Sequence, residues 1–322
     1  MKILIDAFGC DNPEQFISGI ATAINETENV TLVVAGDEKT IESILAGEQF
    51  DRSRLEILDA SEVISNEDSP VLAIRRKKKS SLVVAYENLK KSDEYHVMIS
   101  AGNTGAVIAG AVLLLGRENS ETRPTLATFF PNEKGTMTCL ADCGANVDCR
   151  AEHLLQFATH ASGYVKKVYA IESPRVALLS VGTEDQKGNQ TTKEAFELLK
   201  KSNLNFVGNM EAKTALSGEV DVIVADGFWG NVLLKTIEGT AKFMMNKTLE
   251  LLLKNAEKGV DLSFVKKTFY ELKQTIDFNS LGGAVLLGAK KPIIKAHGSA
   301  NAETMVNTVK QAVNMINSGY IR

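Results

Sequence analysis

The sequence has no uninterrupted run of about eighteen apolar residues, the length that a membrane-spanning helix requires. Its longest apolar stretches are broken by Gly, Lys or Glu. The first residues, MKILIDAFG, also lack the basic, apolar and small-residue regions of a secretory signal peptide. We therefore expect a cytoplasmic protein that does not cross a membrane.

Cysteine and histidine are both scarce, with four residues of each in a chain of 322. Cys139, Cys143 and Cys149 are close in sequence, but neither a C-x-x-C pair nor a pair of histidines accompanies them. Zinc ligation is therefore disfavoured, and so is cysteine nucleophile catalysis, because no neighbouring base is evident. We expect reduced, buried thiols and no metal.

The chain also lacks the excess of positive charge that binds nucleic acid. It has 36 basic and 40 acidic residues, a net charge of −4 and a pI of about 5.7. We therefore expect no nucleic-acid partner, and any anion must be bound by a local cluster. One such cluster is Arg75–Lys79, five basic residues in a predicted helix. Such a run is usually a solvated face, and the alternative is a contact with an acidic carrier protein or its prosthetic phosphate.

What the sequence does have is a repeated alternation of short apolar runs with longer segments of helical spacing. Typical apolar runs are KILIDAFG, TLVVAGD, HVMISAGNTG, RVALLSVGTED and VDVIVADGFWGN. Strands that are apolar along their whole length predict a parallel sheet covered by helices on both faces, an α/β fold of the doubly wound type. Because no repeat and no linker is visible, we expect residues 1–322 to form a single domain.

In such sheets ligands bind beyond the carboxyl ends of the strands, where loops lead into helices. One of these junctions is Ser100–Ala106, SAGNTGA. Gly102 and Gly105 permit close approach of the backbone to a ligand. Asn103 and Thr104 add side-chain donors, and the dipole of the following helix favours an anion. The junction therefore predicts a phosphate site, and a tight turn that needs glycine for its geometry is the alternative.

A second junction, Ala141–Cys149, places two carboxylates and an amide around a glycine after an apolar run. Asp142, Asn146 and Asp148 are candidates for the wall of a polar site. An Asx-turn that caps the following helix is the alternative interpretation.

A third junction, Gly182–Asn189, carries Lys187 among turn residues. A lysine at a strand end can supply a point charge for phosphate or for an oxyanion. A solvated loop lysine is the alternative, and it is the more common case for a lysine considered by itself.

Two further junctions complete the set of candidates. Asp226–Asn231, DGFWGN, is followed by a helix with Lys235 one turn in. Lys295–Ser299, KAHGS, ends the last apolar run. A lone histidine is more often structural than catalytic, but the position of His297 at a strand end favours a functional role.

Taken together, these junctions resemble the motifs of the PlsX-type phosphate acyltransferases. The similarity rests on SAGNTGA, RPTLAT, ADCGANVDC followed by EHLLQFA, KGN, LNFVGN, DGFWGNVLLKTIEG, GGAVLLG and IIKAHGSA, in that order. It runs from about Met1 to the last helix, which ends in NSGYIR. Motifs in this number and order are far more specific than any single glycine loop.

The resemblance implies a Rossmann-like, three-layer α/β/α sandwich with a mostly parallel sheet, related to the isopropylmalate dehydrogenase-like fold. It implies transfer of an acyl group from the thioester of acyl carrier protein to inorganic phosphate, giving an acyl phosphate that feeds phospholipid synthesis. It also implies a homodimer, no metal or nucleotide cofactor, and peripheral association with the inner face of the membrane. The candidate membrane element is a protruding helical pair near residues 240–275, for which a core or dimer helix is the alternative.

The resemblance extends to the first turn, with one departure. The family motif is similar to D-A-M-G-G-D-x-A-P, and this chain has Asp6, Gly9 and Asp11 at matching positions. Phe8 and Cys10 stand where the family has methionine and glycine. If this loop lines the site, we expect the larger side chains to alter acyl preference or to weaken activity.

Phosphate is anionic at neutral pH, so its attack on a thioester needs alignment and charge stabilisation more than a base. We expect Lys187 to stabilise developing charge, and His297 to orient phosphate or to assist the departing thiolate. The candidate catalytic residues are Lys187, Asn189, Asp226 and His297. The candidate substrate- and phosphate-binding residues are Asp6, Gly9, Asp11, Gly102, Asn103, Thr104, Gly105, Asp142, Asn146, Asp148, Gly230 and Asn231.

Three rival functions follow from the same residues. A phosphotransacetylase acting on a coenzyme A thioester would need a similar phosphate site, and dependence on carrier protein separates the two. A dehydrogenase is disfavoured, because no G-x-G-x-x-G follows an early strand. A catalytically weakened family member that serves as a scaffold is the non-enzymatic alternative.

Overall fold

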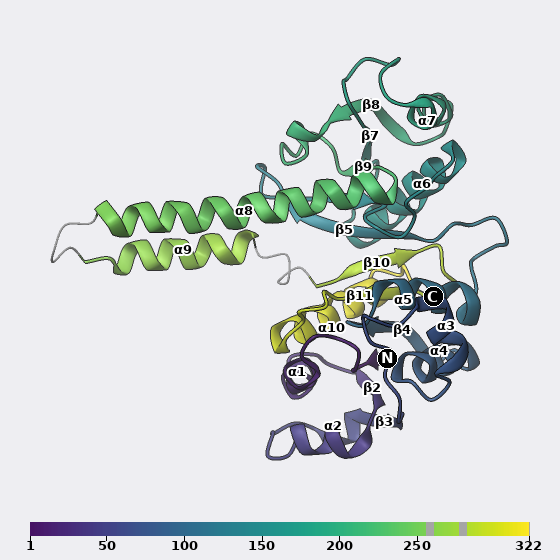
Figure 1. The fold of residues 1–322 in the computed structure, drawn as a ribbon, viewed down its shortest axis with the longest axis vertical. Helices are drawn as coiled ribbons and strands as arrows, with labels where there is room; N and C mark the ends of the chain where they lie inside the picture. Colours follow the sequence, from purple (N-terminus) through teal and green to yellow (C-terminus); the bar gives the residue numbers. More distant parts are fainter. Residues whose placement is uncertain (256–260, 277–281, 322) are drawn as a thin grey trace.

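The protein is described by a computed structural model that covers residues 1–255, 261–276 and 282–321. Within these residues the chain builds one large sheet (Figure 1). Its strands are β1 (Lys2–Asp6), β2 (Thr31–Gly36), β3 (Leu55–Asp59), β4 (Tyr95–Ser100), β5 (Thr125–Pro131), β6 (Met137–Ala141), β7 (Arg175–Ser180), β8 (Asn205–Glu211), β9 (Val222–Val224), β10 (Ala284–Leu287) and β11 (Ile293–Lys295). Their spatial order is β3-β2-β1-β4-β11-β10-β5-β6-β9-β7-β8.

The sheet is mostly parallel, as predicted, but its strands do not all run in one direction. β3, β2, β1, β4 and β11 form one block of parallel neighbours. β6, β9, β7 and β8 form a second. Between the blocks, β11 with β10, β10 with β5 and β5 with β6 pair antiparallel. Three reversals leave the two blocks running in opposite directions, so the carboxyl ends of β4 and β7 do not lie along one edge of the sheet.

Helices cover both faces of the sheet, which confirms the predicted three-layer α/β/α sandwich. Apolar residues alternate between the faces, so that Ile3 and Ile5 pack in one core cluster and Leu4 packs in the other. The first face carries α1 (Pro13–Asn25), α2 (Glu38–Ile44), α6 (Ala151–Val168), α7 (Gln190–Lys200) and α10 (Ala302–Asn317). The second carries α3 (Pro70–Arg76), α4 (Ser81–Lys91), α5 (Thr104–Gly110), the π-helical segment η2 (Ala111–Leu115) and the start of α8 (Gly227–Asn255). Two short 3-10 turns, η1 (Arg52–Arg54) and η3 (Ala212–Thr214), lie in connections.

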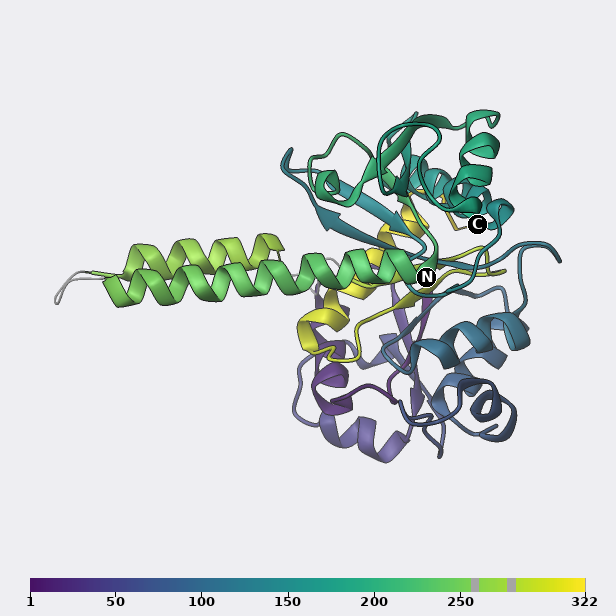
Figure 2. The same ribbon diagram turned by 45° about the horizontal axis from the view of Figure 1, so that its top comes forward.

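One element leaves the body of the molecule. α8 begins against the sheet, where Leu233 and Leu234 are buried, and continues far beyond it (Figures 1 and 2). α9 (Ser263–Ile276) runs back alongside α8. Large apolar side chains of this projecting pair are exposed, among them Phe243 and Phe264. None of the described helices is long and apolar enough to span a membrane.

Candidate active site

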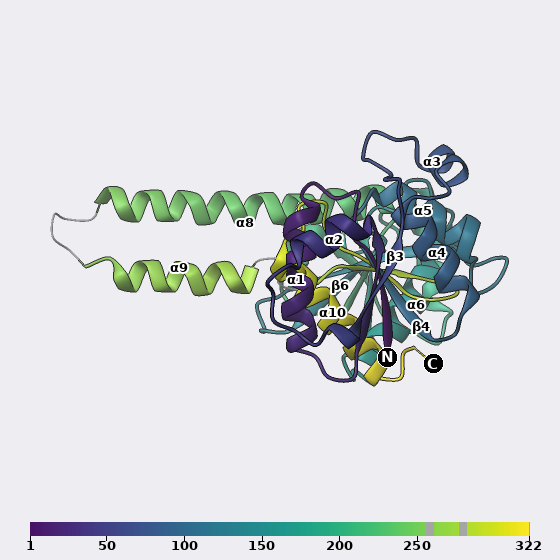
Figure 3. The ribbon, with the colours of Figure 1, turned by 90° about the horizontal axis from the view of Figure 1, so that it is seen from below.

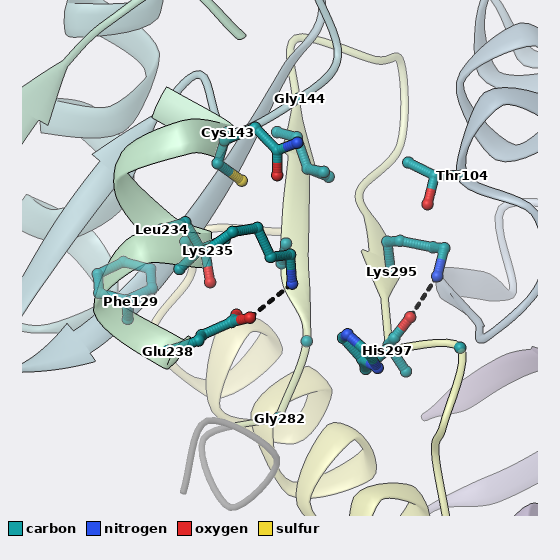
Figure 4. Close-up of a pocket in the computed structure, with 17 residues that line it drawn as sticks. Thr104, Phe129, Cys143, Gly144, Leu234, Lys235, Glu238, Gly282, Lys295 and His297 are labelled. Atoms are coloured by element: carbon teal, nitrogen blue, oxygen red, sulfur yellow. Dashed lines mark hydrogen bonds and ion pairs between the residues drawn. The ribbon is translucent and has the colours of Figure 1, made fainter. Parts of the chain in front are cut away.

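A cavity of about 380 Å³ lies on the second face of the sheet, against the first turns of α8 (Figure 4). Residues of β5 and of the start of β10 line it, and Lys235 and Glu238 approach it from α8. Lys295 and His297 approach it from the opposite side, at the end of β11. Its polar lining is Thr104, Thr128, Asn231, Lys235, Glu238, Lys295 and His297, and its larger apolar lining is Leu126, Phe129, Cys143 and Leu234. The cavity thus combines several cationic or donor groups with an apolar surface.

Lys295 is the buried cation of this cavity. It is the last residue of β11, and only 8% of its surface is exposed. In the sheet register Lys295 pairs with Ser100 of β4, and Ser100 pairs with Asp6 of β1. Residues in one row across parallel strands project from the same face, so these three side chains lie together beneath α4 and α5.

Asp6 is the buried anion of the same row, with 1% of its surface exposed. Its carboxylate accepts hydrogen bonds from Ser81 Oγ at 2.6 Å and from Ser100 Oγ at 2.7 Å. Burial raises the pKa of Asp6 to about 6, although the two hydroxyl groups and the charge of Lys295 oppose the shift. Asp6 therefore remains mostly ionised at neutral pH.

The ammonium group of Lys295 is held by backbone carbonyl oxygens. It donates to Ala296 O, and it lies 3.5 Å from Ala101 O. Burial lowers the pKa of Lys295 to about 8, while the negative charges of Asp6 and Asp11 raise it. An ammonium group has three N–H donors, so the contacts within the described residues leave one donor for a ligand.

His297 follows two residues after Lys295, and its ring is oriented by Ser299. The backbone N–H of Ser299 donates to His297 Nδ1 at 3.3 Å, and Ser299 Oγ lies 2.8 Å from the same atom. A backbone N–H can only donate, so Nδ1 is an acceptor and the neutral ring carries its proton on Nε2. Burial lowers the pKa of His297, and the positive charges of Lys235 and Lys295 lower it further. At neutral pH the ring is an Nε2–H donor.

On the other side of the cavity, α8 presents an ion pair. Lys235 Nζ lies 2.7 Å from Glu238 Oε2, one turn further along the helix. This spacing places both side chains on one face of α8. Lys235 is about half exposed, so it is a solvent-accessible cation at the mouth rather than a buried one.

The predicted phosphate loop after β4 reaches the cavity through Thr104, whose side chain faces it in Figure 4. Asn103 has another role, because its Oδ1 accepts from Ala106 N at 3.0 Å and thereby caps α5. Its Nδ2 donates to the carbonyl oxygens of Ser65 and Asn66, at 3.2 and 3.3 Å. Asn103 therefore fixes the loop, and Thr104 faces the ligand space.

The backbones of the loops after β1 and β4 lie close together. Gly9, with a φ of +89°, lies against Gly102, and a Cβ on Gly102 would lie 3.2 Å from Asp6 Oδ2. Gly105 packs against Pro70 at the start of α3. Asp11 is exposed, and its backbone N–H donates to Gly298 O at 2.9 Å. That hydrogen bond ties the β1–α1 loop to the loop of His297.

The loop after β6 supports the cavity from behind. Asp142 is fully buried and accepts from the backbone N–H groups of Leu126, Ala145 and Asn146. Burial raises the pKa of Asp142, and these hydrogen bonds oppose the rise. The Asn146 side chain donates to Pro124 O at 2.8 Å. These residues shape the loop, whereas its Cys143 and Gly144 line the cavity.

The start of α8 is built on this loop. Asp226 Oδ1 accepts from Trp229 N at 2.8 Å, which caps the helix, and burial raises the pKa of Asp226. Exposed Asp148 contributes a like charge nearby. A Cβ on Gly230 would lie 1.8 Å from Asp142 O, so glycine is required for this close approach. One residue further on, Asn231 lines the cavity.

Lys187 and Asn189 do not line this cavity. Both are exposed in the β7–α7 loop, and Asn189 Oδ1 accepts from Thr192 N at 2.9 Å as the cap of α7. Phe8 and Cys10 do not line it either, and the Phe8 ring packs against Gly36 of β2. The altered first turn therefore leaves the described cavity open.

The four cysteines, which were considered as metal ligands and as nucleophiles, can be placed as well. Cys139 and Cys143 are buried, and burial raises the pKa of each thiol far above its usual value. Cys10 and Cys149 are half-buried. Within residues 1–255, 261–276 and 282–321, no group of three or more His, Cys, Asp or Glu side chains is arranged to hold a metal ion.

Comparison with known proteins identifies the family of the chain. The family model described as "Fatty acid synthesis protein" matches residues 1–322. The phosphate acyltransferase of Clostridioides difficile is 43% identical over 314 residues, which cover 97% of this chain and 92% of that protein. The one from Geobacillus thermodenitrificans is 44% identical, with 98% of this chain and 95% of that protein covered.

Solved structures with low sequence identity share the fold. A phosphotransacetylase from Streptococcus pyogenes superposes with a TM-score of 0.62 at 17% identity, over 97% of this chain and 94% of that one. A 4-hydroxythreonine-4-phosphate dehydrogenase from Salmonella typhimurium gives 0.52 at 14% identity, over 98% and 99%. The fold is thus shared by acyl-transferring and dehydrogenase proteins, whereas the full-length matches above 40% identity are to phosphate acyltransferases. The chain therefore belongs to the PlsX-type family of phosphate acyltransferases.

Proposed function

We propose that the protein transfers an acyl group from the thioester of acyl carrier protein to inorganic phosphate and releases an acyl phosphate for phospholipid synthesis. The observation that carries this proposal is the buried Lys295, which lines a cavity together with His297, Lys235 and an apolar surface. A cation of this kind suits an oxyanion, and the apolar surface suits an acyl chain. The names of the full-length relatives support the same reaction.

In the proposed reaction, Lys295 and the Thr104 hydroxyl hold phosphate, and the ammonium of Lys235, which is paired with Glu238, adds a hydrogen-bond donor at the mouth. A phosphate oxygen forms a bond to the thioester carbon, and the C–S bond then breaks. The Nε2–H of His297 donates a hydrogen bond to the carbonyl oxygen or to the sulfur as negative charge develops there. The thiolate takes up a proton from solvent after it leaves.

The roles of the remaining candidates follow from their positions. Asp6 keeps Lys295 charged, and Asp142, Asn146, Asp148, Asp226 and Gly230 shape the wall that carries Asn231. Lys187 and Asn189 lie outside the cavity wall, so their part in stabilising charge stays a prediction from the sequence.

The projecting α8–α9 pair supports a proposal about assembly. We propose that it joins two copies of the chain in a homodimer, because Phe243, Phe264 and Tyr270 are more than half exposed on it. Peripheral contact with the inner face of the membrane is the second proposed use of these side chains. Sedimentation, and flotation with anionic vesicles, of wild type and a Phe243→Ser/Phe264→Ser variant would separate the two uses.

A phosphotransacetylase that acts on coenzyme A thioesters is the second candidate, favoured by the fold shared with the Streptococcus pyogenes protein. The deciding experiment is formation of acyl phosphate, trapped with hydroxylamine, from long-chain acyl carrier protein and separately from the matching acyl-CoA. Phosphate-dependent product from the carrier substrate is the expected result. Product from acyl-CoA alone would establish the second candidate, and product from neither would favour the scaffold.

A further inference from the structure

The segment between β3 and α4 contains a surface that the proposed reaction does not use. It consists of Val71, Leu72, Arg75 and Arg76 of α3, with Lys78 and Lys79 directly after the helix, and we call it the α3 surface. We propose that the α3 surface is the docking site for the acidic protein that carries the acyl thioester. The inference rests on the proposed function, because it assumes that a carrier protein delivers the acyl group.

The charge of the α3 surface differs from that of the chain. Residues 62–79 contain five basic and three acidic residues, although the whole protein has a net charge of −4. Lys77 is engaged, since its Nζ lies 2.6 Å from Asp68 Oδ2. Arg75, Arg76, Lys78 and Lys79 form no ion pair with any residue in the part of the chain that the structure describes. The Lys78 ammonium donates to Ile74 O at 3.2 Å, so Arg75, Arg76 and Lys79 are the cations available to a partner.

The same surface has an apolar part. Val71 and Leu72 are 45% and 47% exposed, whereas Ala73 and Ile74 on the opposite side of α3 are buried in the core. Exposed apolar side chains bordered by unpaired cations fit an acidic protein that presents its own apolar contact. A small anion such as free phosphate would use the cations but not Val71 and Leu72.

The α3 surface also lies beside the cavity. Pro70, the first residue of α3, packs so closely on α5 that a Cβ on Gly105 would lie 2.7 Å from Pro70 Cγ. Asn103 binds the preceding loop through Ser65 O. Thr104, the residue between Asn103 and Gly105, lines the cavity. Figure 3 shows α3 beside α5, so a carrier on α3 stands next to the Thr104 wall and can extend its thioester arm into the cavity.

Charge reversal provides the test. We compare wild type with Arg75→Glu/Arg76→Glu, and with a control, Lys90→Glu/Lys91→Glu. Lys90 and Lys91 end α4 at the amino end of β4, the edge of the sheet opposite to Ser100 and Lys295. Binding of the holo form of acyl carrier protein is measured by titration. We then measure kcat/KM with two substrates, acyl carrier protein and the same acyl group carried by pantetheine.

The α3 variant is expected to bind the carrier about tenfold or more weakly, because each reversal replaces attraction by repulsion, and added salt should shrink the difference. The control should bind like wild type, and kcat/KM with acyl-pantetheine should not change. Unchanged carrier binding in the α3 variant would overturn the proposal. The proposal would also be overturned if the α3 variant lost binding to phosphatidylglycerol vesicles but still bound the carrier, because the α3 surface would then be a membrane-binding surface.

Two further variants make the result interpretable. If charge reversal lowers the melting temperature, Arg75→Ala/Arg76→Ala replaces it, with the same loss of carrier binding expected and smaller in size. Val71→Ser/Leu72→Ser tests the apolar part and should weaken binding without changing its salt dependence. The binding measurement needs no turnover, so the two proposals can be separated. If the wild type forms no acyl phosphate but binds the carrier, and charge reversal removes that binding, the proposed function is contradicted and the docking site is supported.

Discussion

Asp6 and Lys295 lie on either side of Ser100 in one row of the sheet. Burial favours the neutral form of each side chain, so it raises the pKa of Asp6 to about 6 and lowers the pKa of Lys295 to about 8. Each charge also opposes the shift of the other, because the ammonium lowers the pKa of Asp6 and the carboxylate raises that of Lys295. At neutral pH the row is therefore charged at both ends. A ligand in the cavity meets its positive end.

Removal of the cation tests this arrangement directly. Lys295→Met should lower kcat/KM for phosphate by about a hundredfold or more, the usual loss when a donor to a developing oxyanion is removed. The fold should persist because Met fills the same space and Asp6 keeps its hydrogen bonds from Ser81 and Ser100, while its carboxylate takes up a proton more readily once the ammonium is gone. Lys290→Met, at an exposed position, is the control. Wild-type saturation by phosphate in Lys295→Met would contradict the assignment.

The pH profile tests the influence of Asp6 on Lys295. The cation is present below its pKa of about 8 and is lost above it, so kcat/KM should fall as the pH rises through about 8. Asp6→Asn removes the charge that raises this pKa, so the alkaline limb should move to lower pH. Asp11→Asn should move it in the same direction by less, because Asp11 ranks behind Asp6 among the groups that raise the pKa. A limb that stays in place in Asp6→Asn would show that Lys295 does not govern it.

His297 should act through its Nε2–H. His297→Ala is expected to reduce kcat about a hundredfold, the lower end of the range for loss of a hydrogen-bond donor to developing negative charge. Ser299→Ala keeps the backbone N–H that fixes the ring and loses only the hydroxyl contact, so it should retain most of the activity. Equal losses in the two variants would mean that the hydroxyl, and not the imidazole, carries the effect.

Two glycines of α8 make a matched pair for stability. Gly230→Ala should destabilise the protein by about 3 kcal/mol or more, because its Cβ would overlap Asp142 O and push α8 off the β6 loop. Gly239→Ala, where no atom lies within 4 Å of the new Cβ, should stabilise it by about 0.5–1 kcal/mol through helix propensity. Urea denaturation measures both changes. A tolerated Gly230→Ala would be inconsistent with the close approach.

Lys187→Ala tests the residue that was selected from sequence and that lies off the cavity wall. Its side chain is exposed, so the unfolding free energy should stay within about 0.5 kcal/mol of wild type. Turnover is expected to fall if the lysine stabilises developing charge. Unchanged kinetics would leave that stabilisation to Lys295 and Lys235.

Much of the fold was predictable because its signals are local. Apolar runs ending in Gly, Asp or Asn marked β1, β4 and β7, and each run lies in the sheet. The reversal between the two blocks was not visible, since it depends on β10 and β5 pairing antiparallel across a long stretch of chain. Lys187 and Thr104 both follow apolar strands, yet their strands run in opposite directions.

The candidate site shows the same division. Thr104, Asn231 and His297 were selected from loops and line the cavity. The Lys295–Ser299 motif did not indicate a role for Lys295 itself, because the burial of this lysine arises from β11 pairing with β4. A lysine at the end of an otherwise apolar run, PIIKAH, is the signal that could have identified it.

The position of β11 also bears on how the protein is made. Four strands of the first block, β3, β2, β1 and β4, are synthesised within the first hundred residues, but the neighbour of β4 on its other side is β11, which ends at Lys295. On the ribosome β4 is therefore an open sheet edge, exposed to pairing with other chains, until nearly the whole protein has emerged. Because Lys295 arrives on that same strand, a truncated chain that lacks it leaves the edge of β4 unpaired and the cavity without its buried cation.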